Sequence, residues 1–293
     1  MDPPFNEIYN NLLYNQITKK DNDVSEIPFS FSVTAVVEEV ELPVIDVSRL
    51  IDGAEEEREK CKEAIARASR EWGFFQVINH GISMDVLEKM RQEQIRVFRE
   101  PFDKKSNSTM EKFASESEAL AYMLAEVLAE KSGQNSSFFK ENCVRNTCYL
   151  RMNRYPPCPK PSEVYGLMPH TDSDFLTILY QDQVGGLQLI KDNRWIAVKP
   201  NPKALIINIG DLFQAWSNGM YKSVEHRVMT NPKVERFSTA YFMCPSYDAV
   251  IECSSDRPAY RNFSFREFRQ QVQEDVKKFG FKVGLPRFLN HVY

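Results

Sequence analysis

Apolar residues recur at helical spacing in the first half of the chain. Those of residues 54–72 fall on one face of a predicted helix. The same spacing predicts a second helix around residues 86–97. A third is predicted from Ser108, where Glu111 completes a capping box. A short helical turn is predicted at residues 138–139.

Strand-like runs are few before Cys148 and frequent after it. The first half has two, at residues 42–47 and 74–78. After Cys148, short apolar runs with turn residues between them recur about every ten residues, which is typical of an antiparallel barrel or sandwich. These runs are residues 175–180, 186–190, 195–198, 204–209, 223–229, 238–243 and 249–253. A last helix is predicted from Ser264 to Gly280.

The order of these elements predicts a mixed α/β (α+β) fold. Residues 1–147 form a mostly helical region with short strands, and their first 40 or so positions form an irregular lead-in. Residues 148–293 form a β core with a C-terminal helix. No linker-like stretch separates the two regions, so we expect neither to fold independently.

Composition and charge narrow the function classes. The chain has 293 residues, 42% of them hydrophobic, which is enough for a sizeable core. Its net charge of -4 is mixed along the sequence, so no basic stripe indicates nucleic acid or a membrane surface as a partner. The first residues lack the pattern of a secretory signal and no apolar stretch is long enough to span a bilayer, so we expect neither. The six cysteines form no CxxC pair, which favours reduced thiols and a cytoplasmic location.

Two of the four histidines stand in a pattern suited to metal binding. Asp172 lies two residues after His170, so on a strand both side chains project to one side. This pair alone is close to chance. His226 in the strand-like run 223–228 supplies a third ligand from elsewhere in a barrel. Two imidazoles and one carboxylate are typical of non-haem iron(II) oxygenases. The alternatives are histidines satisfied by hydrogen bonds, or a zinc hydrolase site.

A second group of polar residues is suited to a dicarboxylate. Arg236 begins an apolar run, with Ser238 on the same side of the strand. A guanidinium in such a run needs a carboxylate partner, which a dicarboxylate ligand supplies. Asn153 and Tyr155 lie two apart and can donate into the same pocket. The alternatives are an exposed arginine at a strand end and ordinary turn chemistry.

These motifs occur in an order that resembles the plant 2-oxoglutarate- and iron(II)-dependent dioxygenases, from about Leu42 to the end of the chain. Overall similarity is greatest to gibberellin 2-oxidases, in particular those acting on twenty-carbon gibberellins. The matching segments are residues 42–46, 72–81, 153–159, 166–172, 185–189, 208–211, 223–228 and 236–238.

The resemblance implies a double-stranded β-helix (jelly-roll) core and specific residue roles. His170, Asp172 and His226 would bind iron(II). Arg236 and Ser238 would hold the distal carboxylate of 2-oxoglutarate. Tyr155 and Asn153 would assist in binding this carboxylate. His80 matches a structural position. The implied reaction uses O2, with ascorbate as a further cofactor, releases succinate and CO2, and 2β-hydroxylates a gibberellin-like diterpenoid acid. We expect a monomer.

The chain departs from this family in one place. Between residues 98–105 and 109–112 the family carries roughly forty to fifty more residues, including strands that extend the main sheet and cover its edge. Here only Ser106, Asn107 and Ser108 remain. We therefore expect iron and 2-oxoglutarate binding to survive and the substrate pocket to be incomplete.

Three other functions compete with gibberellin hydroxylation. The first is the same chemistry on another plant small molecule. The second is a catalytically weak or silent protein that only binds iron and 2-oxoglutarate. A zinc hydrolase is the least favoured, because it leaves Arg236 and Ser238 without a function.

Overall fold

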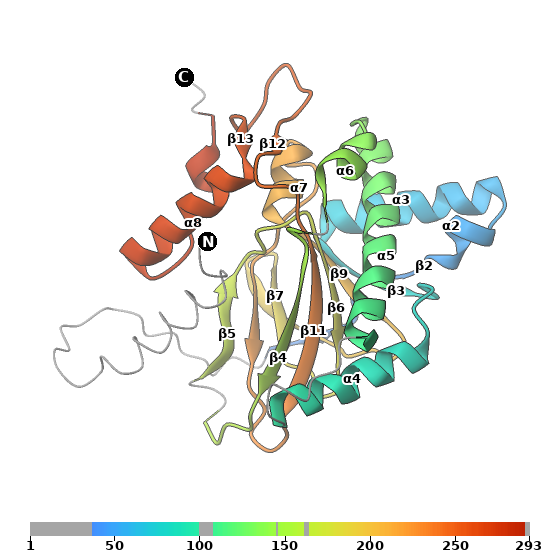
Figure 1. Ribbon diagram of the computed structural model, residues 1–293, viewed down its shortest axis with the longest axis vertical. Coiled ribbons are helices and arrows are strands. Elements are labelled where there is room, and N and C mark those ends of the chain that lie inside the picture. The colour runs from blue at the N-terminus through green and yellow to red at the C-terminus, as the bar shows by residue number, and fades with distance from the viewer. Residues whose placement is uncertain (1–36, 100–107, 145, 161–163, 291–293) are drawn as a thin grey trace. The chain divides into compact units, whose positions relative to one another are not determined.

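The computed structural model describes residues 37–99, 108–144, 146–160 and 164–290 (Figure 1). Most of the predicted irregular lead-in lies outside these residues. The predicted helices are present as α3 (Glu55–Glu71), α4 (Met84–Arg99), α5 (Ser108–Ser132), α6 (Ser137–Asn142) and α8 (Phe265–Phe279). Short helices α2 (Ser48–Asp52) and α7 (Asp211–Trp216) and the 3-10 turn η2 (Leu285–Phe288) complete the helical elements of the described residues.

Two sheets face each other in the core. The six-stranded sheet has the order β2-β3-β9-β6-β11-β4 and the five-stranded sheet the order β1-β8-β7-β10-β5. Pairing is antiparallel except between β2 and β3 and between β1 and β8. The first sheet comprises β2 (Val44–Asp46), β3 (Phe74–Ile78), β4 (Tyr149–Tyr155), β6 (Leu176–Gln181), β9 (Leu205–Ile209) and β11 (Arg236–Met243). The second comprises β1 (Glu39–Val40), β5 (Tyr165–His170), β7 (Leu187–Lys191), β8 (Arg194–Val198) and β10 (His226–Met229). A separate hairpin pairs β12 (Val250–Ile251) with β13 (Phe263–Ser264).

Apolar side chains from both sheets fill the space between them. Leu187, Leu189 and Ile196 of the smaller sheet pack with Phe74 and Ile206 of the larger one, all buried. Each such side chain contributes about 1.5–3 kcal/mol on burial. This core confirms the predicted jelly-roll with helices before it and a helix after it.

Helices α3, α4 and α5 contact strands of the six-stranded sheet, and α5 runs along β6 and β11 (Figure 1). The C-terminal helix ends as predicted. Ser264 Oγ accepts a hydrogen bond from the Glu267 amide at 3.1 Å, and Gly280 ends the helix at φ 82°. No helix of the described residues is long and apolar enough to cross a membrane.

Some predicted boundaries were wrong. The predicted strand 223–229 begins only at His226. The reason is that Ser223 bonds side chains instead of a neighbouring strand: its amide donates to Gln214 Oε1 at 2.7 Å. Helix α7 was not predicted, because its residues continue the apolar run that begins in β9.

Candidate metal and co-substrate site

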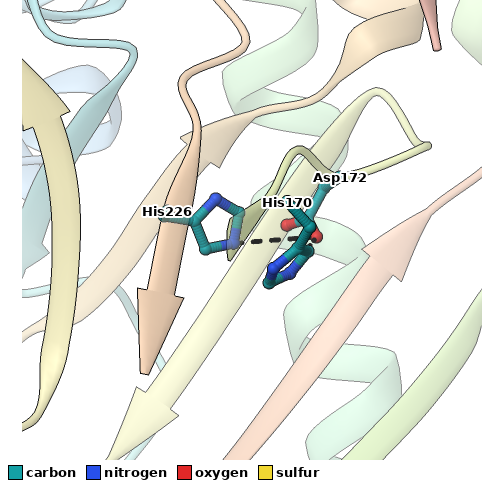
Figure 2. A group of neighbouring side chains, drawn as sticks. All are labelled: His170, Asp172 and His226. Atoms are coloured by element: carbon teal, nitrogen blue, oxygen red, sulfur yellow. Dashed lines mark ion pairs between the residues drawn. The ribbon is translucent and has the colours of Figure 1, made fainter. Parts of the chain in front are cut away.

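The structure brings His170, Asp172 and His226 together. His170 ends β5 and His226 begins β10, and these strands pair with the two histidines directly opposite each other. Asp172 follows β5 in the chain. One ligand atom from each residue lies within 4.8 Å of the others. Asp172 Oδ1 is 3.6 Å from His170 Nε2 and 3.8 Å from His226 Nε2 (Figure 2).

Hydrogen bonds leave the inner nitrogen of each imidazole available. His170 Nδ1 lies 2.8 Å from the Met168 carbonyl, and His226 Nδ1 lies 3.1 Å from the Val224 carbonyl. A carbonyl only accepts, so each Nδ1 carries the proton and each Nε2 presents a lone pair. This is the tautomer that a metal ligand needs. The ring of Phe74 packs edge-on against His226, with centroids 5.2 Å apart.

The carboxylate of Asp172 is held through its other oxygen. Thr177 Oγ1 lies 2.6 Å and Asn208 Nδ2 lies 2.8 Å from Asp172 Oδ2. Thr177 Oγ1 also lies 2.9 Å from Asp174 Oδ2. Its single hydroxyl hydrogen can serve only one of the two acids. Burial raises the pKa of Asp174 well above its usual range. Both bonds to the Asp172 carboxylate fall on Oδ2. Oδ1 of Asp172 is thereby left facing the histidines.

Protonation states at this site suit a cation. Burial, followed by the charge of His226, lowers the pKa of His170 to about 3. Burial acts to raise the pKa of Asp172, but the charges of His226 and His170 and the hydrogen bonds to its carboxylate lower it to about 2. At neutral pH the site therefore offers a lone pair on His170 and an ionised carboxylate, as metal binding requires.

The donor set fits iron(II). Two atoms bound to one ion at about 2.1 Å each lie at most about 4.2 Å apart, and both carboxylate–imidazole separations meet this limit. Two imidazoles and one carboxylate on one side leave positions for further ligands, which is the arrangement of non-haem iron oxygenases.

The first turn of α7 fixes the loop that carries Asp172. The amide of Asp211 donates to the Asp172 carbonyl at 2.9 Å, and the amide of Leu212 donates to the Asp174 carbonyl at 3.0 Å. Only glycine fits at position 210, because a Cβ there would lie 2.1 Å from Asp174 Oδ1. The loop therefore depends on the backbone of α7 and on Gly210.

Asp211 also connects three segments through its buried side chain. Its Oδ1 accepts from Ser223 Oγ at 2.6 Å, three residues before His226. Its Oδ2 accepts from Thr171 Oγ1 at 3.2 Å and pairs with Lys282 Nζ at 2.6 Å. Lys282 Nζ donates further to the Thr171 carbonyl at 2.9 Å. The segment after α8 is thus tied to both parts of the metal site.

Arg236 is buried without an ion-pair partner among the described residues. It is 1% exposed. Its Nη2 donates to Gln181 Oε1 at 2.6 Å, its Nη1 to Ser238 Oγ at 3.4 Å, and its Nε has no partner in the described part of the chain. The nearby acid Asp182 uses its two oxygens on the amides of Val184 and Phe237. An unpaired buried guanidinium is costly, so this site favours an incoming carboxylate.

Tyr155 and Asn153 lie across from Arg236 and Ser238 in the β4–β11 ladder. The Arg236 guanidinium lies 5.1 Å from the centre of the Tyr155 ring. Gly166 makes room for that ring, since a Cβ at Gly166 would lie 2.7 Å from Tyr155 Cδ1. The Asn153 side-chain oxygen accepts from Arg151 Nε at 3.0 Å. All four predicted residues therefore adjoin one another, and their ligand roles stay predictions.

Several supporting residues escaped the sequence analysis. Asn208 and Asp211 belong to a segment that the family resemblance includes, but nothing in the sequence indicated their contacts. No sequence motif pointed to Thr177, Gln181 or Lys282, because their roles depend on neighbours far away in the chain.

Two family models match the chain. The model of the 2OG-Fe(II) oxygenase superfamily matches residues 142–245, and a model described as non-haem dioxygenase in morphine synthesis N-terminal matches residues 42–161. Gibberellin 2-beta-dioxygenase 8 of Arabidopsis thaliana is 86% identical, with 100% of both chains covered. Gibberellin 2-beta-dioxygenase 6 of Oryza sativa subsp. japonica is 42% identical, with 99% of this chain and 97% of the relative covered.

The alignment with the Arabidopsis relative spans 338 positions, whereas this chain has 293 residues, so 45 positions face no residue here. Solved structures agree in fold. JOX2 in complex with 2OG, Fe and JA is 28% identical, with a TM-score of 0.71 over 86% of this chain and 91% of that one. A dioxygenase for auxin oxidation in rice is 25% identical, with a TM-score of 0.73 over 85% of this chain and 100% of that one.

Proposed function

The chain belongs to the 2-oxoglutarate- and iron(II)-dependent oxygenases, and from this premise we propose that it 2β-hydroxylates gibberellins, with twenty-carbon gibberellins as the preferred class. The observation that carries the proposal is the 86% identity to a gibberellin 2-beta-dioxygenase over the whole of both chains. The oxidant is O2, the co-substrate is 2-oxoglutarate, and the co-products are succinate and CO2. We propose the cytoplasm as the location.

His170, Asp172 and His226 would hold the iron. When bound, iron(II) supplies O2 activation coupled to oxidative decarboxylation of 2-oxoglutarate, which provides the oxidant for an unactivated C–H bond. The protein's part is to keep the ligand atoms in place. The bonds from Thr177 and Asn208 fix which oxygen of Asp172 faces the metal.

The distal carboxylate of 2-oxoglutarate would pair with Arg236. The guanidinium and Ser238 Oγ are both buried and lie on one side of β11. The free Nε supplies a further donor, so a bidentate pair is available. We assign Tyr155 and Asn153, on the adjoining β4, as assisting residues.

Arg151 is our candidate for the cation that receives the gibberellin carboxylate. It lies two residues before Asn153 on β4, so its side chain shares the face that carries Asn153 and Tyr155. Its charge is among the causes that lower the pKa of His170, which supports a position near the iron. Beside it, the rings of Tyr149 and Phe242 stack with centroids 4.6 Å apart and offer an apolar wall for the diterpenoid body.

Turnover by the purified full chain tests this proposal. The protein is supplied with iron(II), ascorbate, 2-oxoglutarate and O2, and twenty-carbon or nineteen-carbon gibberellins are compared. The expected product carries one added oxygen at carbon 2, formed together with one succinate. Arg151→Met should raise KM for gibberellin and leave succinate release without gibberellin unchanged. Hydroxylation at another carbon, or of other plant metabolites only, would refute the assignment.

A second candidate follows from the 45 positions that this chain lacks relative to the Arabidopsis protein. If they complete the substrate pocket, the chain binds iron and 2-oxoglutarate and releases succinate slowly, with no gibberellin dependence. The same assay separates the two: gibberellin-dependent succinate release supports the hydroxylase, and gibberellin-independent release supports the binding form.

A further inference from the structure

The outer edge of β4 is paired with no other described strand and could accept one. β4 ends the six-stranded sheet, and among the described strands its one neighbour is β11. The two strands pair over seven consecutive residues without a register shift. The other edge strands differ: β1 and β2 have two and three residues, and the β5 ladder is irregular. Long, regular, unprotected edges are the sites where proteins add a further strand.

The pattern of hydrogen bonds shows which backbone groups face outward. The amide and carbonyl of Phe237 both bond Asp182, on the β6 side. Directions alternate along a strand, so the polar groups of Ser238 face β4, and those of its partner Asn153 face β11. Leu150, Met152 and Arg154 therefore turn their N–H and C=O groups outward, away from the sheet, where the described residues place no neighbouring strand.

The surroundings of the edge are consistent with a missing piece of structure. A cavity of about 420 Å³ lies beside it, lined by Leu150 and Tyr149 of β4, Tyr241 of β11 and the start of α5. Helix α5 begins at Ser108, where the sequence predicts the missing family segment, and the alignment with the Arabidopsis relative has 45 more positions than this chain. Tyr149 is 41% exposed.

We propose that this edge binds the β4 edge of a second copy of the same chain, antiparallel, with the two-fold axis at Met152. The monomer expected from the sequence is the alternative outcome of the test. In this register Met152 faces Met152 of the other copy, and Leu150 faces Arg154. Each outward-facing residue then opposes another outward-facing residue, which forms three hydrogen-bonded pairs, or about six backbone hydrogen bonds.

Charge favours this register over its neighbours. Although β4 carries two arginines, Arg151 faces Asn153 of the other copy and Arg154 faces Leu150. Each arginine also has a partner within its own chain: Arg151 Nε donates to Asn153, and Arg154 Nε bonds a carboxylate at 3.0 Å. Centring the axis on Arg154 would set arginine against arginine and use Pro156, which has no N–H. Centring it on Leu150 would leave Arg154 unpaired.

The two-fold axis allows a charge-swap experiment. Met152→Lys and Met152→Glu each place like charges opposite each other, so each variant alone should be a monomer of 34.0 kDa. An equimolar mixture should recover the dimer, because lysine then faces glutamate. Val250→Lys, at a 47% exposed position on β12, is the matched control and should dimerise like the parent. Mass is measured by light scattering across a concentration series.

Cobalt(II) binding and far-UV circular dichroism confirm that each variant is folded. Met152→Pro is a second test, because the N–H it removes faces outward and the β4–β11 ladder loses nothing. It should be monomeric. The proposal is overturned by a parent that is monomeric at every concentration, by single variants that still dimerise, or by a mixture that stays monomeric.

Discussion

Arg236→Met tests whether the buried guanidinium is present for a ligand or for the fold. The arginine is 1% exposed and has no carboxylate partner within the described residues, so the empty protein bears the cost of burying its charge. Methionine is similar in length and needs no such partner. We expect the ligand-free variant to gain about 1 kcal/mol in free energy of unfolding, or about 2 °C in Tm.

Arg236→Met should weaken the binding of 2-oxoglutarate, although it stabilises the ligand-free protein. Removing one member of a buried charge pair costs about 2–5 kcal/mol, and about 3 kcal/mol corresponds to a roughly 100-fold weaker Kd. At a concentration 100 times the parent Kd, 2-oxoglutarate stabilises the parent by about 2.7 kcal/mol. The same concentration would equal the variant's Kd and stabilise it by only about 0.4 kcal/mol.

The assay is anaerobic thermal unfolding of the manganese-loaded protein, with and without 2-oxoglutarate, supported by calorimetry. Arg227→Met is the control. Arg227 is also buried, but its Nε donates to Gln188 at 2.8 Å and its guanidinium lies 4.0 Å from the centre of the Trp195 ring. This variant should lose stability and keep its ligand-induced shift. If Arg236→Met loses stability as Arg227→Met does and still binds 2-oxoglutarate as the parent does, the arginine is structural and the reasoning fails.

Further predictions concern the supports of the metal site and one distant histidine. Asn208→Ala removes the 2.8 Å bond to Asp172 Oδ2, and iron(II) affinity should fall about 10-fold in an anaerobic titration, while urea unfolding shows the fold intact. Lys282→Met leaves the buried carboxylate of Asp211 without its cation, so the free energy of unfolding should fall by about 3 kcal/mol. The control Lys278→Met, on the exposed end of α8, should change the free energy of unfolding by less than about 0.5 kcal/mol. Burial lowers the pKa of His80, so the unfolded chain takes up the proton first and stability falls as pH drops below the ordinary histidine pKa of about 6.5. His80→Gln should flatten that fall between pH 7 and pH 5 in urea titrations, and an unchanged slope would contradict the assigned cause.

The structure brings together the three residues that the sequence predicted as metal ligands. Their local spacing is close to chance by itself, and the ordered family motifs made the prediction specific. His170 and Asp172 are two apart, and His226 begins the strand that pairs with β5. The sequence could not show what orients them. Asn208 reaches Asp172 from a different strand, and Lys282 reaches the same loop from beyond the last helix. Neither residue type differs from an ordinary surface asparagine or lysine until the chain has folded.

The secondary structure was also predicted best where the sequence pattern is local. Segments with a clear helical or alternating pattern, such as Phe74–Ile78 and Phe265–Phe279, were predicted closely. Helix α7 was missed because Leu212 and Phe213 are buried like the strand before them. β5 was identified as a ligand-bearing segment and not as a regular strand, since its residues are only partly buried and it contains Pro169.

The positions of these residues along the chain explain how a shortened protein can keep its metal centre. The groups whose hydrogen bonds support the iron ligands, from Met168 to Lys282, come after β4, whereas the expected shortening at residues 106–108 comes before it. Removing a segment there therefore deletes none of the hydrogen bonds of the metal site. We expect it to expose the strand that carries Arg151, Asn153 and Tyr155. Loss of that segment should thus affect substrate capture and association at β4 first, and iron binding last.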